Sequence, residues 1–167
     1  MGMQQGTRSD SLATTMPASP PIPPPGTFRA KVVNAFTNAN VMLYRRSGGR
    51  LGNTVKGAPV LLLDHVGRKS GRARTAPVLY MRDGEDLVIV ASRGGSDAMP
   101  AWWLNLRATP TTAVQIGTER RRVVAREASA EEKAELWPRL VEMYGDYEIY
   151  QRRTEREIPV VILSPAA

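Results

Sequence analysis

The chain has 167 residues, a formal net charge of +7 at pH 7, 42% hydrophobic residues, no cysteine and one histidine. This length suits a single domain, and the lack of cysteine excludes disulfides, thiolate catalysis and cysteine-bound metal. One histidine excludes a two-histidine metal site, so we expect a metal-free, cytoplasmic protein. The positive charge lies mostly in turns, which favours a shaped pocket for a small anion over a nucleic-acid-binding stripe.

Residues 1–26 differ in composition from the rest of the chain. Six of the 13 prolines fall between Pro17 and Pro25. Such a tract is typical of a polyproline-like or disordered tail. The sequence therefore predicts a disordered, proline-rich tail over 1–26 and one folded domain over 27–167. A recognition motif for a proline-binding module is the alternative for the tail.

A helix is predicted over 28–46, where the apolar residues recur at helical spacing until two glycines stop the pattern. These residues are Phe28, Val32, Phe36, Ala39 and Leu43, followed by Gly48 and Gly49. We expect this apolar face to cover a sheet. A flap over a pocket, or contact with a membrane surface, is the alternative.

Strands dominate the remainder of the chain. Apolar runs between turn residues predict strands over 59–63, 75–81, 87–91, 113–116, 122–125 and 158–163. Asp83-Gly84 and Gly117 supply tight turns between neighbouring strands. Strands joined in hairpins, with helices between and around them, indicate an antiparallel barrel of the α+β class.

Two further helices are predicted among these strands. Pro100 can open a short helix that carries Trp102 and Trp103. Ser129 and Glu132 form a capping-box signature for a helix that runs through Met143 and is kinked or split by Pro138.

The turn after the first strand is strongly basic. Between Gly67 and Arg74 it carries Arg68, Lys69, Arg72 and Arg74. Guanidinium forks, ammonium groups and the exposed N–H groups of glycine turns bind phosphates and carboxylates. A second turn of this kind, Ser92-Arg93-Gly94-Gly95, follows the third strand. Together they suggest an elongated anionic ligand, such as the tail of a nucleotide-like cofactor; a solvated basic hairpin is the alternative.

Aromatic side chains follow these turns. Trp102 could form a wall for a flat ring, and Asn105 can offer a donor and an acceptor to a pyrimidine-like edge. Trp103 is expected in the core. Tyr144, Tyr147 and Tyr150 recur every three residues, so they could line an apolar substrate pocket and donate a proton, or simply pack against the barrel. Asp64, His65 and the triplet at 120–122 are assigned no functional role.

The order of the basic turn, Ser92-Arg93-Gly94-Gly95 and Pro100-Ala101-Trp102-Trp103-Leu104-Asn105-Leu106 resembles the deazaflavin-dependent nitroreductase family, of the subgroup A type. The resemblance extends from about Leu43 to Pro165. It implies an FMN-binding-like, antiparallel split β-barrel with flanking helices. It also implies hydride transfer from reduced coenzyme F-420 (8-hydroxy-5-deazaflavin) to an electron-poor acceptor, such as a quinone, a nitroaromatic, or an activated alkene of enone or coumarin type.

The resemblance also implies a set of site residues. The cofactor's phosphate and polyglutamate tail would lie on Arg68, Lys69 and Arg74, with Ser70 in the same turn. Ser92 and Tyr147 would be catalytic. All expected cofactor contacts are Arg68, Lys69, Ser70, Arg74, Thr75, Ala76, Pro77, Val78, Val90, Ala91, Ser92, Arg93, Gly94, Ala101, Trp102, Asn105 and Tyr147. The substrate would contact Trp102, Tyr144, Tyr147 and Tyr150.

Two pairs of residues depart from the family's pattern. Leu79-Tyr80 stands where relatives can carry Tyr then Phe, so the aromatic lining is rearranged. Ala98-Met99 stands where relatives can carry Lys-Asn, so the resemblance does not imply an identical substrate range. FMN in a similar barrel is the alternative cofactor, and a non-enzymatic module for nucleic acid or membrane is the distant alternative. We expect a small-molecule acceptor, no nucleic acid, and a monomer or weak dimer, with peripheral membrane contact left open.

Overall fold

The computed structural model describes residues 23–24 and 27–167. The predicted disordered tail therefore lies outside the described residues, apart from 23–24. Within the described part of the chain, no helix is both long and apolar enough to cross a membrane.

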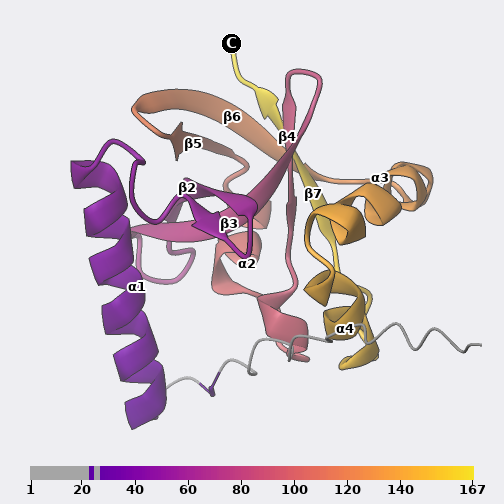
Figure 1. The fold of residues 1–167 in the computed structure, drawn as a ribbon, viewed down its shortest axis with the longest axis horizontal. Helices are drawn as coiled ribbons and strands as arrows, with labels where there is room; N and C mark the ends of the chain where they lie inside the picture. Colours follow the sequence, from indigo (N-terminus) through magenta and orange to yellow (C-terminus); the bar gives the residue numbers. More distant parts are fainter. Residues whose placement is uncertain (1–22, 25–26) are drawn as a thin grey trace, which may run out of the picture.

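Six antiparallel strands close into a barrel (Figure 1). They are β2 (Ala58–Val66), β3 (Ala73–Asp83), β4 (Asp86–Val90), β5 (Thr111–Ile116), β6 (Glu119–Glu127) and β7 (Val160–Pro165). The order is β2-β3-β4-β7-β6-β5, and β5 returns to pair with β2, while a short β1 (Thr54–Val55) adds to the outer side of β2. The predicted α+β barrel is confirmed, and closure leaves few free strand edges.

The closing seam between β2 and β5 is short. Only Leu62–Gln115 and Leu63–Val114 pair across it. On its other side β2 pairs with β3 at seven positions, from Val60 to Val66. The ladder between β2 and β5 does not continue beyond Leu63, and there the Thr112 hydroxyl of β5 donates to the Asp64 backbone carbonyl instead.

Helices cover both sides of the barrel and one end of it (Figure 1). They are α1 (Phe28–Arg46), α2 (Ala101–Ala108), α3 (Ala130–Met143) and α4 (Asp146–Arg152), with a single 3-10 turn, η1 (Arg93–Gly95), before α2. α1 lies on one side, and α3 and α4 lie on the other. α2 places Trp103 and Leu106 in the interior cluster of the barrel, so the prediction of Trp103 in the core is confirmed.

After Asp86, the residues of strand β4 are all apolar. Leu87 and Ile89 point into the barrel, whereas Val88 and Val90 pack under α3 and α4. Both faces of the strand are buried, so polar residues are excluded from both. At α3, the predicted capping box forms between Ser129 and Glu132, and the helix is not split at Pro138.

The helix α1 has the predicted bounds, but Phe28, Ala39 and Leu43 of its predicted apolar face are exposed. Val41 and Tyr44 are buried against Leu62, while Leu43 is 48% exposed and Phe28 is 83% exposed. The Tyr44 hydroxyl donates to the Val60 carbonyl (3.1 Å) and accepts from the Gly117 N–H (2.9 Å). A polar atom that satisfies barrel backbone groups thus sets the orientation of the helix, and hydrophobicity alone does not reveal it.

Candidate functional site

A groove of about 1040 Å³ lies between α1, the end of the β2–β3 hairpin, the start of α2 and strands β5 and β6. Its charged lining consists of one acid, Asp64, and the four arginines Arg45, Arg72, Arg74 and Arg120. Its apolar lining includes Ala76, Ala101 and Trp102. The groove therefore combines a surplus of positive charge with one flat aromatic wall, a lining suited to an anionic ligand that carries a ring.

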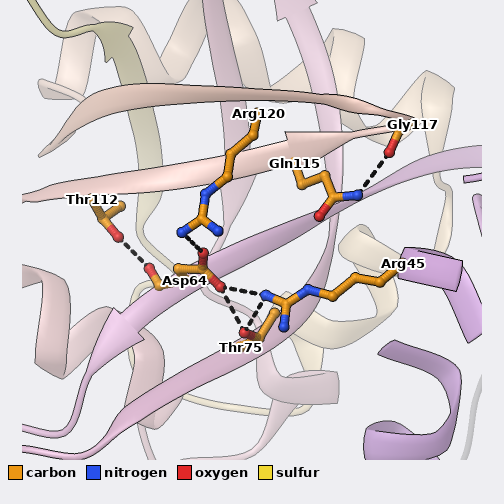
Figure 2. Close-up of polar contacts among 7 residues, drawn as sticks. All are labelled: Arg45, Asp64, Thr75, Thr112, Gln115, Gly117 and Arg120. Atoms are coloured by element: carbon orange, nitrogen blue, oxygen red, sulfur yellow. Dashed lines mark hydrogen bonds and ion pairs between the residues drawn. The ribbon is translucent and has the colours of Figure 1, made fainter. Parts of the chain in front are cut away.

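Asp64 is the centre of the polar contacts in this groove (Figure 2). Its Oδ1 accepts from Arg45 Nη2 at 2.9 Å and from Thr75 Oγ1 at 2.6 Å, and its Oδ2 accepts from Arg120 Nη2 at 2.6 Å. One carboxylate thus joins α1, β3 and β6. Sequence reasoning missed this role. The signal was available, because Asp64 is the only acidic residue between Ser11 and Arg82.

The basic turn 67–72 is a closed loop whose backbone bonds to itself. The Gly67 N–H donates to the Arg72 carbonyl (2.8 Å), and the Gly71 N–H donates to the Gly67 carbonyl (2.7 Å). Arg68, Lys69 and Ser70 are exposed in this turn. The turn can therefore present its cationic side chains to a ligand while its own backbone stays fixed.

Asn105 of α2 ties this turn to the barrel. Its Oδ1 accepts from the Arg68 backbone N–H at 3.0 Å and from Arg68 Nη1 at 3.3 Å. Its Nδ2 lies 2.9 Å from Nδ1 of His65. The amide is buried, and these contacts use its oxygen and its nitrogen. In this structure Asn105 positions the turn, whereas the sequence suggested that it would contact a ring.

These contacts fix the charge of His65. Because Nδ2 of Asn105 is a donor, Nδ1 of His65 must accept, so the ring is neutral with its proton on Nε2. Burial and the nearby Arg74 guanidinium lower the pKa of His65 below its ordinary value of 6.5, against the opposing effect of Asp64. The sequence predicts no functional role for His65. In the structure it accepts a hydrogen bond from the Asn105 amide, and that amide in turn binds the basic turn.

We expect the stability contributed by a neutral His65 to decrease as the pH is lowered. Below about pH 6.5 the unfolded chain takes up a proton on this ring while the folded chain resists it, so acid favours unfolding. Urea unfolding at pH 7.5 and 5.5 measures this. The stability of wild type relative to His65→Gln, which can still accept the hydrogen bond but does not titrate, should be smaller at pH 5.5. An unchanged difference would contradict the assignment of a neutral, buried ring.

The turn that contains Ser92 is held from behind by Arg156. The Arg156 guanidinium donates to the carbonyls of Ser92 (2.9 Å), Ser96 (2.8 Å) and Ala91 (3.2 Å). Burial lowers the pKa of Arg156. Sequence reasoning missed this residue, because the partners are 60 or more positions apart along the chain.

Gly95 in the same turn is required by packing. Its φ is +78°, and a Cβ there would lie 2.7 Å from the Tyr150 carbonyl oxygen of α4. Gly95 therefore lies in close contact with the backbone of α4. η1 consequently packs directly on α4.

The three tyrosines form a buried cluster on the α3 and α4 side of the barrel. The hydroxyls of Tyr144 and Tyr150 lie 3.2 Å apart, and the Tyr147 ring packs edge-on against Tyr144. Burial raises the pKa of Tyr147 well above its ordinary value. None of the three lines the groove described above. In this structure the three tyrosines pack against the barrel.

The predicted cofactor contacts fall into three groups. Arg74, Thr75, Ala76, Ala101 and Trp102 come together in the groove. Arg68, Lys69, Ser70 and Asn105 belong to the adjoining turn and its support. The groove is not lined by Pro77, Val78, Val90, Ala91, Ser92, Arg93, Gly94 or Tyr147, of which Val78 and Ala91 belong to the barrel interior.

The fold and this groove define a small split-barrel protein with a site for an anionic, ring-bearing ligand. The family model described as "F420H(2)-dependent quinone reductase" matches residues 36–165. An F420H(2)-dependent quinone reductase of Mycobacterium tuberculosis strain CDC 1551 is 40% identical over 126 residues, which are 73% of this chain and 85% of that protein. A second protein, of strain H37Rv and provisionally given the same name, is 48% identical over 110 residues, which are 66% of this chain and 92% of that protein.

Solved structures agree with this result. The F420-H2 dependent reductase FDR-A is 37% identical, with a TM-score of 0.59 over 64% of this chain and 94% of that one. A structure described as a domain-swapped dimer is 31% identical, with a TM-score of 0.60 over 80% of this chain and 99% of that one. The chain belongs to the F420H(2)-dependent quinone reductase family and is a deazaflavin-dependent oxidoreductase that uses coenzyme F-420. The comparisons thus favour F-420 over the FMN alternative, and an enzyme over a non-enzymatic module.

Proposed function

We propose that this enzyme binds F-420 in the groove, with the ring beside Ala76, Ala101 and Trp102 and the phosphate on Arg68, Lys69 and Arg74. The observation that carries the proposal is the lining itself: four arginines against one acid, next to a half-buried tryptophan. The residues present fit the group, because guanidinium and ammonium donors match phosphate and carboxylate oxygens, and Trp102 offers a flat face.

The proposed substrates are electron-poor acceptors: quinones, nitroaromatics, and activated alkenes of enone or coumarin type. When bound, reduced F-420 supplies the hydride, and the protein supplies orientation and exclusion of water. Asn105 holds the basic turn in place, Arg156 holds the Ser92 turn, and Trp102 forms part of the wall of the groove.

Ser92 and Tyr147 are the proposed proton-handling residues. The phenol of Tyr147 is protonated at neutral pH, as a proton donor requires, although burial raises its pKa and so makes it a weaker acid. Tyr147 and Tyr150 belong to α4, Tyr144 directly follows α3, and all three are buried against the barrel. Their proposed contact with substrate therefore requires α4 to shift when the acceptor binds. The monomer or weak dimer, and peripheral membrane contact through the exposed Phe28, also stay predictions.

A fluorescence titration with F-420, with FMN for comparison, tests the proposed position of the cofactor in the groove, which we call its seat. Lys69→Ala and Arg74→Ala should each weaken F-420 binding about threefold to tenfold, because each removes a partly screened charge-assisted contact. Arg152→Ala is the matched control, since Arg152 is an exposed arginine of α4 on the other side of the barrel. Turnover of menadione by reduced F-420 then tests the acceptor class. Equal F-420 affinity in all three variants would refute this seat.

A further inference from the structure

Two arginines reach the groove from elements that the basic turn does not include. Arg45 belongs to the last turn of α1 and Arg120 to β6, and both converge on Asp64 (Figure 2). Each guanidinium uses only Nη2 for its contacts with Asp64 and Thr75. Nε and Nη1 of both arginines therefore keep their donors unused by the residues that the structure describes.

The groove follows the edge of β2 from one face to the other. Asp64 and His65 are consecutive, so their side chains leave opposite faces of the strand. His65 faces Asn105 of α2, whereas Asp64 faces Arg45 and Arg120. Both residues line the same groove, which therefore connects the Trp102 wall with the two arginines on the far face.

The charges do not balance within the groove. Asp64 already accepts from two arginines and from Thr75, and no other acid lines the groove among the described residues. Arg72 and Arg74, together with Arg68 and Lys69 in the adjoining turn, are sufficient for a phosphate and its neighbouring carboxylate. Arg45 and Arg120 are then left for negative charge that lies further along the ligand.

We propose that Arg45 and Arg120 form a second anion site, which binds distal carboxylates of the glutamate tail of F-420. Asp64 is its positioning residue, because it accepts from Nη2 of both guanidinium groups and leaves their other donors for a ligand. This inference rests on the proposed seat of the cofactor in the groove. It makes affinity depend on tail length, since a short tail reaches only the basic turn.

Binding measurements with forms of the cofactor that differ only in the tail test this site. Arg120→Ala should weaken binding of a long-tailed F-420 about threefold to fivefold at low salt, and Arg45→Ala/Arg120→Ala about tenfold, as expected for partly exposed ion pairs. Both variants should bind the tail-less deazaflavin as wild type does. The loss should shrink as salt is added, because salt screens such exposed charges.

Arg122→Ala is the matched control. Arg122 lies two residues from Arg120 on the same strand, is exposed and does not line the groove. It removes the same charge and should leave both ligands bound as in wild type. Equal losses in Arg122→Ala and Arg120→Ala would overturn the proposal, because they would show a diffuse charge effect.

Arg74→Ala separates this inference from the proposed seat. If Arg74→Ala weakens binding of the long-tailed form but Arg120→Ala does not, the second anion site is refuted and the seat is retained. If neither variant weakens that binding, the seat itself fails. If Arg120→Ala weakens the tail-less form as strongly as the long-tailed form, the arginine acts on something other than the tail, which also overturns the inference.

Discussion

Asn105→Ala should lower the free energy of unfolding by about 2–3 kcal/mol, because it leaves the buried Nδ1 of His65 and the part-buried Arg68 N–H without partners. The residue is 4% exposed and joins the Arg68 N–H to Nδ1 of His65. The same substitution should weaken F-420 binding by about tenfold or more, which is the equivalent of about 1.4 kcal/mol. The reason is that the basic turn loses its tie to α2 and no longer presents a fixed set of cations.

Urea unfolding and F-420 fluorescence titration measure the two effects. Asn105→Asp is the informative companion, because its carboxylate still accepts from the Arg68 N–H but faces His65 with an acceptor. His65 must then carry a proton on Nδ1, so this variant should regain stability relative to Asn105→Ala as the pH is lowered. A destabilised Asn105→Ala that binds F-420 as tightly as wild type would show that the turn is not the cofactor seat.

Arg156→Ala should lower both stability and turnover. The guanidinium donates to three carbonyl oxygens around the Ser92 turn. Its removal takes one donor from each of them, although the Ser92 oxygen keeps the Gly95 N–H, and we expect a cost of about 2–3 kcal/mol. We expect kcat to fall about tenfold, because small displacements near reacting groups are costly. F-420 affinity should change less, since Arg156 contacts neither the basic turn nor the groove.

Steady-state reduction of menadione and thermal unfolding, measured side by side, test this prediction. Arg156→Lys should recover little of the loss, because an ammonium group cannot bridge several carbonyls as the guanidinium does. Arg152→Ala, an exposed neighbour in sequence, should behave as wild type in both measurements. If Arg156→Ala keeps wild-type turnover at a temperature where it is folded, the Ser92 turn has no part in catalysis.

The elements of the fold were predictable from local pattern. Strand β4 is buried on both faces, so its residues after Asp86 are all apolar. The capping box at Ser129 and Glu132 predicts the start of α3. The orientation of α1 was not predictable. It depends on hydrogen bonds from Tyr44 to Val60 and Gly117, and a count of apolar residues gives Leu43 and Phe28 more weight than a tyrosine.

The candidate site was predictable only in its local part. The basic turn and Trp102 are visible because their residues are neighbours along the chain. Asp64 and Arg120 are 56 positions apart, and they meet because the barrel closes between β2 and β5. Arg156 and Ser92 are 64 positions apart. Such pairs follow from strand register and from helix docking, which a single sequence does not specify.

The short ladder between β2 and β5 makes the site part of the closure of the barrel. Two register pairs hold this seam, and just beyond it Asp64 links β2 to β6 through Arg120 and to α1 through Arg45. A ligand that binds the groove only when the barrel is closed would stabilise the closed form by mass action, by about 2.7 kcal/mol at a hundred times its Kd. Cellular supply of the cofactor would therefore also govern how often this seam opens, and with it the exposure of the barrel interior to proteases.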